Sequence, residues 1–141
     1  MRYWLMKSEP EEFSIEDLRR IQVAGWDGVR NYQARNFLRA MKKGDQALFY
    51  HSNANPPGIA GTMLIVRQAY PDRDSSPRAP RWSQVDVKFL KVFKKMLSLD
   101  EIRRVPALKN MVLLKHGRLS VQPVTPAEWK TLLKLLNRHE G

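Results

Sequence analysis

The chain has 141 residues, contains no cysteine and carries 25 Lys and Arg against 14 Asp and Glu, a formal net charge of +11. The lack of cysteine excludes disulfides, thiolate metal sites and cysteine nucleophiles. The length predicts one domain over residues 1–141, and no apolar run is long enough for a signal peptide or a membrane span. We therefore expect a soluble, cytoplasmic protein with no membrane partner. Its positive charge favours nucleic acid as the partner, unless the charge serves solubility alone.

The N-terminal part of the chain predicts a strand followed by a short helix. Arg2–Ser8 alternates and is rich in aromatic residues, which is typical of a strand. Ser14 is suited to cap the helix that follows, and Gly25 is expected to end this helix or the turn after it. The helix residues expected to face the core are Ile15, Leu18 and Ile21.

The segment Trp26–Asn36, W-D-G-V-R-N-Y-Q-A-R-N, mixes a large aromatic, a glycine turn, asparagines and arginines. This mixture suits one wall of a pocket better than a core. The segment runs into a helix whose apolar stripe is Ala34, Phe37, Leu38 and Met41. A second face of the same region is basic, and it is either merely solvated or in contact with phosphate. The basic residues are Arg35, Arg39, Lys42 and Lys43.

The middle of the chain is rich in β-structure. Gln46–Ser52 and Val85–Val92 alternate as strands, and Ile59–Ala69 is a further β-rich run. Gly58 and Gly61, near the start of that run, indicate a bulge or a close backbone approach. Between these strands, Tyr70–Trp82 is the one long irregular segment, and a loop of that length is usually functional or disordered.

The C-terminal part predicts a helix over Ser98–Arg104, a short strand over Arg118–Val124 and a final helix capped by Thr125. Leu108–Leu114 is ambiguous between a helical turn and a strand. The apolar stripe of the last helix is Trp129, Leu132, Leu133 and Leu136. With about six strands and short helices that do not alternate regularly, the chain predicts an α+β fold, a small mixed β-barrel with helices on its outside.

Catalytic and metal-binding patterns are weak. The three histidines, His51, His116 and His139, have no metal-ligand spacing, and no cofactor motif is present. His51 is the one candidate for chemistry because it is close to Ser52 and Asp45, although adjacent residues of a strand point to opposite faces. We predict no catalytic residue, metal or cofactor.

Four tryptophans divide into two kinds. Trp4 and Trp129 fall on predicted core positions, whereas Trp26 and Trp82 lie in polar, irregular segments. Two such loop tryptophans could form a slot for a flat ring, and stacking of a base on one aromatic contributes about 1–3 kcal/mol. The alternative is that each tryptophan simply packs its loop against the barrel.

Six blocks together resemble the EVE domain family, and they come in the family's order over nearly the whole chain. They are Y-W-L-M-K-S-E-P at Tyr3–Pro10, W-D-G-V-R-N-Y-Q-A-R-N-F-L at Trp26–Leu38, G-D-Q-A-L-F-Y-H-S-N at Gly44–Asn53, G-I-A-G at Gly58–Gly61, V-D-V-K at Val85–Lys88 and R-L-S-V-Q-P-V at Arg118–Val124. The resemblance implies a PUA-like mixed β-barrel flanked by short helices and related to the YTH readers of methylated adenine. It also implies a reader of modified bases, notably modified cytosine in DNA.

The same resemblance suggests site residues. The base-binding pocket would comprise Lys7, Ser8, Trp26, Asn31, Ser52, Asn53 and Trp82. Trp26 would stack on a flipped base, while Asn31, Ser52 and Asn53 would read its Watson–Crick edge. The phosphate-binding candidates are Arg30, Arg35, Arg39, Lys42 and Lys43.

Three functions follow from these observations. The first is a non-enzymatic reader of a modified base in DNA or RNA, for which the family resemblance points to modified cytosine in DNA. The second is a general RNA-binding module of the PUA type without selectivity for modification. The third is a nucleotide-processing enzyme that uses His51 as an acid or base.

Overall fold

The computed structural model describes residues 1–76 and 81–138. Its six strands are β1 (Tyr3–Ser8), β2 (Val23–Trp26), β3 (Gln46–His51), β4 (Gly58–Pro71), β5 (Ser83–Ser98) and β6 (Val121–Val124). The helices are α1 (Ile15–Ile21), α2 (Tyr32–Ala40), α3 (Leu99–Arg103), α4 (Val112–Lys115) and α5 (Pro126–Arg138), together with a 3-10 turn, η1 (Pro106–Leu108). The predicted α+β class is confirmed.

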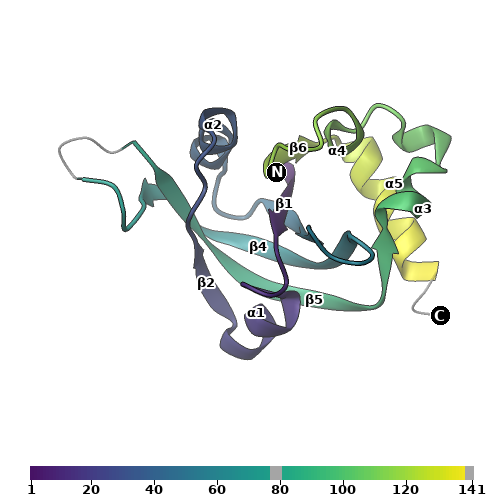
Figure 1. The fold of residues 1–141 in the computed structure, drawn as a ribbon, viewed down its shortest axis with the longest axis horizontal. Coiled ribbons are helices and arrows are strands. Elements are labelled where there is room, and N and C mark those ends of the chain that lie inside the picture. Colours follow the sequence, from purple (N-terminus) through teal and green to yellow (C-terminus); the bar gives the residue numbers. More distant parts are fainter. Residues whose placement is uncertain (77–80, 139–141) are drawn as a thin grey trace.

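All six strands belong to one mixed sheet in the order β2-β5-β4-β3-β1-β6. Strands β1 and β3 are parallel, and the other neighbours are antiparallel. The outermost strands β2 and β6 do not pair with each other within the described part of the chain, so the sheet is open rather than a closed barrel. Both edge strands have only four residues, whereas the central hairpin β4–β5 has strands of 14 and 16 residues and extends beyond its neighbours (Figure 1).

Both faces of the central strands are buried, which explains their nearly continuous apolar sequences. In β1, Trp4 and Met6 enter one hydrophobic cluster with α1 and α2, whereas Leu5 enters a second cluster with α3, α4 and α5. Strand β3 divides its alternate residues between the same two clusters, as the period of two requires. Figure 1 shows α5 and α3 together at one end of the molecule, away from α1 and α2.

Helix α1 buries two of its three predicted core residues, Ile15 and Leu18. Ser14 caps it as predicted, and its Oγ accepts the Asp17 N–H at 3.1 Å. Ile21 is 52% exposed, because at 100° per residue it has turned about 240° from Ile15 and has left the buried face. The helix ends at Gln22, which takes the positive φ of 72°, and Gly25 lies inside β2 instead of ending the helix.

The predicted irregular segment Tyr70–Trp82 lies mostly outside the strands, apart from Tyr70 and Pro71 at the end of β4. Strand β4 continues to Pro71 and β5 begins at Ser83, so the connection covers residues 72–82, of which 77–80 lie outside the described residues. The ambiguous stretch Leu108–Leu114 is resolved as the end of η1 and a helical turn, not a strand.

The predicted close approach at the glycines of β4 is observed. A Cβ atom on Gly61 would overlap the Lys91 carbonyl oxygen on β5 and come within 2.7 Å of the Ile15 side chain on α1. The register between β4 and β5 also shifts beside this residue. Gly61 therefore allows α1 to lie directly on the hairpin.

We expect Gly61→Ala to lower the free energy of unfolding by about 1–3 kcal/mol, because the added methyl group overpacks the contact with α1 and β5. Chemical denaturation measures the change. The matched control is Gly117→Ala, since a Cβ on that glycine would meet no atom within 4 Å. Equal stability of the two variants would contradict the packing argument.

Candidate nucleic-acid interface

An open cavity of about 970 Å³ lies where several chain segments end at one edge of the sheet. The parallel strands β1 and β3 end together, with Ser8 in register with His51 and the Ser52 N–H donating to the Ser8 carbonyl at 3.0 Å. The structure brings six of the seven predicted pocket residues into the lining: Lys7, Ser8, Trp26, Asn31, Ser52 and Asn53. The parallel pairing thus places two short polar sequences, far apart in the chain, side by side.

Trp26 lies in a strand and packs in the hydrophobic core, not in a loop as predicted. It is the last residue of β2, pairs with Val85 of β5 and is only 7% exposed. The edges of neighbouring rings fix it: its centroid is 5.3 Å from that of Phe49 at 81°, and 6.4 Å from that of Phe13 at 79°. Because Trp26 also lines the cavity, a small rigid part of the indole is presented to a ligand.

The polar lining residues are oriented by backbone groups. Asn31 is the N-cap of α2, where its Oδ1 accepts the Ala34 N–H at 2.9 Å. Ser8 Oγ donates to the Phe13 carbonyl at 2.7 Å, and Lys7 Nζ donates to the Gly117 carbonyl at 2.5 Å. Burial lowers the pKa of the Lys7 ammonium group. These bonds limit the positions that the polar groups take around the cavity.

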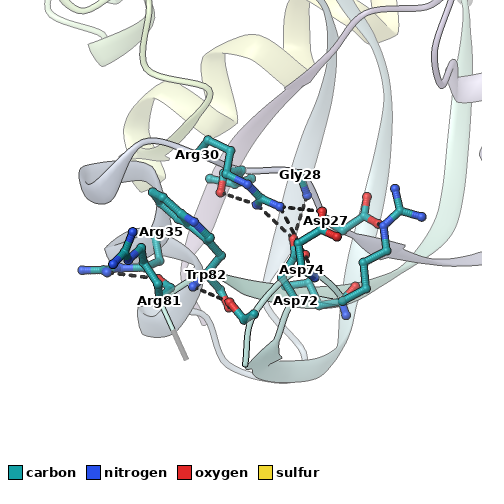
Figure 2. Close-up of polar contacts among 12 residues, drawn as sticks. Asp27, Gly28, Arg30, Arg35, Asp72, Asp74, Arg81 and Trp82 are labelled. Carbon is teal, nitrogen blue, oxygen red and sulfur yellow. Dashed lines mark hydrogen bonds and ion pairs between the residues drawn. The ribbon is translucent and has the colours of Figure 1, made fainter. Parts of the chain in front are cut away.

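A buried carboxylate, Asp72, organises the wall that follows Trp26. It is 1% exposed and accepts the Gly28 N–H at 2.9 Å and the Asp74 N–H at 2.9 Å. The Arg30 guanidinium lies 3.2 Å from the same carboxylate and 3.0 Å from Asp74, as Figure 2 shows. Burial alone would raise the pKa of Asp72, but the hydrogen bonds from Arg30, Asp74 and Gly28 outweigh it and lower that pKa. Gly28 itself has a φ of 80°, a conformation that favours glycine.

The cavity also contains charged residues that the sequence did not single out. Cationic Arg73 and Arg118 line it, as do the carboxylates of Glu9, Glu12 and Asp27. Asp27 and Arg73 form an ion pair at 3.3 Å. Glu9 and Arg118 lie in the blocks S-E-P and R-L-S-V that carry the family resemblance, and their place in these blocks was the signal in the sequence that could have identified them.

Trp82 does not complete the pocket. It is absent from the cavity lining and instead stacks on Tyr32, with ring centroids 5.0 Å apart and ring planes at 23° to each other. Trp26 packs in the hydrophobic core, whereas Trp82 stacks on Tyr32 outside the core. The predicted slot between the two tryptophans therefore does not form.

The predicted phosphate ligands differ in availability. Arg30 is already bound by Asp72 and Asp74. Arg35 donates to the Asn36 side chain at 2.8 Å and to the Arg81 carbonyl at 3.1 Å, both uncharged acceptors. Arg39 is exposed, and its Nε donates to Ser83 Oγ at 3.0 Å. Lys42 and Lys43 are exposed in the turn after α2 rather than on the helix itself.

His51 has a structural contact that the sequence did not reveal. Its Nε2 accepts the N–H of Ile15, the first residue of α1, at 3.1 Å, and burial lowers its pKa. Asp45 precedes β3 whereas His51 ends it, so the two lie roughly 20 Å apart. Asp45 accepts instead from Trp4 Nε1 at 3.0 Å. The Ser–His–Asp arrangement therefore does not form, and His51 is absent from the cavity lining.

Comparison with known proteins matches this architecture to one family. The family model described as EVE domain covers residues 2–135. The chain belongs to the EVE domain family. Human thymocyte nuclear protein 1 is 47% identical, over 94% of this chain and 73% of the human protein.

Solved structures agree with this assignment. A hypothetical protein from Leishmania major has a TM-score of 0.96 at 41% identity, covering 100% of this chain and 98% of that one. The structure of human THYN1 in complex with 5-methylcytosine containing DNA has a TM-score of 0.91 at 46% identity, covering 96% and 98%. The Mmi1 YTH domain shares the fold, with a TM-score of 0.61 at 14% identity over 97% of this chain and 88% of that one. The predicted relation to YTH domains is thus confirmed at the level of fold.

The human relative's name corrects the prediction of a cytoplasmic protein, because it points to the nucleus. The sequence features behind that prediction could not separate the two compartments, since both the cytosol and the nucleus are reducing. Among the described residues of this EVE domain, no helix is both long and apolar enough to cross a membrane, and no group of three or more His, Asp or Glu could hold a metal ion.

We expect Asp72→Ala to lower the free energy of unfolding by about 1–3 kcal/mol, because it leaves the Gly28 N–H and the Arg30 guanidinium without a buried acceptor. Urea denaturation measures the loss. The control is Asp74→Ala, which removes the exposed partner of the same arginine and should change stability by less than about 0.5 kcal/mol. Similar losses in both variants would show that the buried carboxylate has no special role.

Stability should also fall on mild acidification through His51. Its folded-state pKa is lowered, so its contribution is complete above the unfolded pKa of about 6.5 and is lost as pH falls from there through the folded pKa. One such group changes stability by at most about 1.4 kcal/mol per pH unit. In His51→Gln, whose amide oxygen can still accept from Ile15, the thermal midpoint should change less between pH 7 and pH 5 than in the wild type. An unchanged pH profile would exclude this histidine as the cause.

Proposed function

We propose that this EVE domain binds DNA that contains a modified cytosine and that it holds the modified base in the cavity beside Trp26. The observation that carries the proposal is the complex of human THYN1 with 5-methylcytosine containing DNA, a protein 46% identical to this chain over 96% of its length. The cavity lined by Ser8, Trp26, Asn31 and Ser52 is the structural support for it.

The chemistry of the lining suits a flipped cytosine. Proteins read an extruded base by stacking on its faces and by hydrogen bonds to its Watson–Crick edge. Trp26 and Phe13 offer aromatic surface, and the hydroxyl and amide groups of Ser52 and Asn53 offer donors and acceptors. The exocyclic amino group of cytosine is a donor that carboxylates accept from, and Glu9 is a lining carboxylate already close to Asn53, with its Oε1 3.4 Å from Asn53 Nδ2.

The free energies of the individual steps indicate how the affinity divides between the cavity and the contacts with the nucleic-acid backbone. Burying one methyl group contributes about 0.8 kcal/mol, and an apolar site discriminates one methylene by roughly 10–200-fold. Extruding a base costs a few kcal/mol. The methyl group alone cannot offset that cost, so we infer that phosphate contacts of the +11 chain supply most of the affinity and that the cavity supplies modest selectivity.

An enzymatic function receives no comparable support. His51, the residue on which it depended, uses Nε2 to accept from the Ile15 backbone and lies outside the cavity lining. The cavity contains carboxylates, yet recognition of a base requires these groups only as hydrogen-bond acceptors. We therefore favour a reader over a nucleotide-processing enzyme.

The test is titration of otherwise identical duplexes with and without one 5-methylcytosine, together with an RNA of the same sequence, at two salt concentrations. The modified duplex should bind about tenfold more tightly, and all affinities should fall steeply as salt rises. Equal affinity for the two duplexes would contradict the reader while leaving general binding, and preference for the RNA would favour the RNA-binding alternative.

Trp26→Phe tests the role of the cavity. Trp26→Ala is unsuitable, because truncating a buried aromatic costs about 3–5 kcal/mol of stability. The phenylalanine variant should lose most of the preference for the modified duplex while keeping salt-dependent binding. Trp129→Phe is the matched control, since Trp129 is 6% exposed in the other hydrophobic cluster and stacks on Tyr3 away from the cavity. Equal selectivity of both variants would place the base elsewhere.

A further inference from the structure

A partly exposed aromatic stack lies next to the lining residues Arg30 and Asn31 of the cavity. Tyr32, the first residue of α2, is 55% exposed and stacks on Trp82 with centroids 5.0 Å apart. The Arg35 guanidinium lies over Tyr32, 4.8 Å from the ring centroid, and the Arg30 guanidinium lies 5.3 Å from the centroid of Trp82. We call Tyr32, Trp82 and Arg35 the ridge.

The ridge is firmly held from below. The backbone N–H of Trp82 donates to Ser75 Oγ at 2.7 Å, and its carbonyl accepts from the Asp72 N–H at 3.0 Å. Arg35 donates to the carbonyl of Arg81, the residue before the tryptophan, as Figure 2 shows. The two bonds of Trp82 hold the half-buried tryptophan in place, and Tyr32 on top of it stays exposed, although an exposed aromatic surface is unfavourable in water. A large, rigid ring with low conformational entropy is well suited to bind a partner.

The position of the ridge ties it to the cavity. Asn31 lines the cavity and directly precedes Tyr32, while Arg30 both lines the cavity and lies over Trp82. A nucleic-acid strand with one base in the cavity can therefore place a neighbouring nucleotide near the ridge, because successive nucleotides are only a few ångströms apart.

The charge of the ridge favours a polyanion as the partner. The two guanidinium groups beside the stack differ in whether a carboxylate neutralises their charge. Arg30 is paired with Asp72 and Asp74. Within residues 1–76 and 81–138, Arg35 makes no ion pair and donates only to uncharged oxygens. An unneutralised guanidinium forms strong, charge-assisted hydrogen bonds with phosphate oxygens. Its present contact with Tyr32 is the weaker interaction and can be exchanged.

We propose that the ridge binds the nucleotide next to the base in the cavity: that neighbour's base stacks on Tyr32, and Arg35 leaves the ring to pair with the adjacent phosphate. The inference rests on the proposed function and adds a second contact that is independent of the modification. It gives Trp82 a role outside the pocket, as the support on which Tyr32 lies.

Affinities of Tyr32→Ala for the modified and unmodified duplexes test the ridge. Both should fall by the same factor, about 5- to 100-fold, as expected for loss of one stack between a base and an aromatic ring, so the ratio between the duplexes is unchanged. Tyr32→Phe keeps the ring and should bind like the wild type. Arg35→Gln should weaken binding to both duplexes and lower the slope of affinity against salt concentration by about one phosphate contact.

A fluorescent base analogue separates stacking from other effects. A 2-aminopurine beside the modified cytosine is already quenched by stacking in the free duplex. Extrusion of the cytosine should raise its emission on binding by Tyr32→Ala, whereas stacking on Tyr32 should keep the emission low on binding by the wild type. Thermal melting of each variant checks that the fold is intact.

Failure of this inference is distinguishable from failure of the proposed function. In one outcome, the wild type binds with selectivity and Tyr32→Ala has the same affinity, whether or not its melting temperature changes. The ridge then only supports the 72–82 connection and contacts no nucleotide. If the wild type does not distinguish the duplexes yet Tyr32→Ala still weakens binding, the reader is contradicted and the ridge remains. An affinity loss in Tyr32→Phe as large as in Tyr32→Ala would also overturn stacking on the ring.

Discussion

The buried carboxylate of Asp72 is the contact on which the cavity wall depends. One side chain joins the start of the 72–82 connection to the segment after β2, through the Gly28 N–H and the Arg30 guanidinium. Without it, the chain between Trp26 and Asn31 would be joined to this connection by the more exposed ion pairs Asp27–Arg73 and Arg30–Asp74. The cost of burying the charge is offset by several donors at once, which is the condition under which a buried carboxylate stays ionised. Its lowered pKa is the electrostatic sign that this condition is met.

Parallel pairing of β1 with β3 supplies the other wall. Parallel strands end at the same edge of a sheet, so the residues after β1 and those after β3 meet although more than forty positions separate them. The segment Ser52–Asn53 therefore lies beside Ser8–Glu9, and the main-chain bond from Ser52 to Ser8 fixes their spacing. Opposite them, the Asn31 cap begins α2 at the cavity. A cap must use its side chain on the helix, so Asn31 can offer a ligand only the part of its amide that Ala34 leaves available.

Sequence patterns predicted the features that depend on neighbouring residues, such as helix caps. They failed for the features that depend on contacts between segments far apart in the chain. The caps Ser14 and Thr125 could be identified because a cap is readable from three or four neighbouring residues. The alternation of β1 and β3 was readable for the same reason. Strand β2 was missed, since Val23–Trp26 contains a glycine and pairs only with the distant β5. Trp26 and Trp82 looked alike in sequence, yet one is packed against Phe49 and the other lies on Tyr32. The pocket residues came from the family resemblance, because no local rule connects Lys7 with Asn53.

The distribution of charge gives the molecule two modes of contact. The net charge of +11 acts over the whole surface and draws a polyanion without regard to its sequence. The cavity, in contrast, mixes arginines with Glu9, Glu12 and Asp27, so its field is not simply positive. Carboxylates repel phosphate, so in the proposed complex the lining carboxylates would favour a base in the cavity and the backbone on the cationic surface outside. Like-charge repulsion would then orient the ligand as much as attraction binds it. A cavity lined only by cations would bind phosphate in the place where the base is to be read.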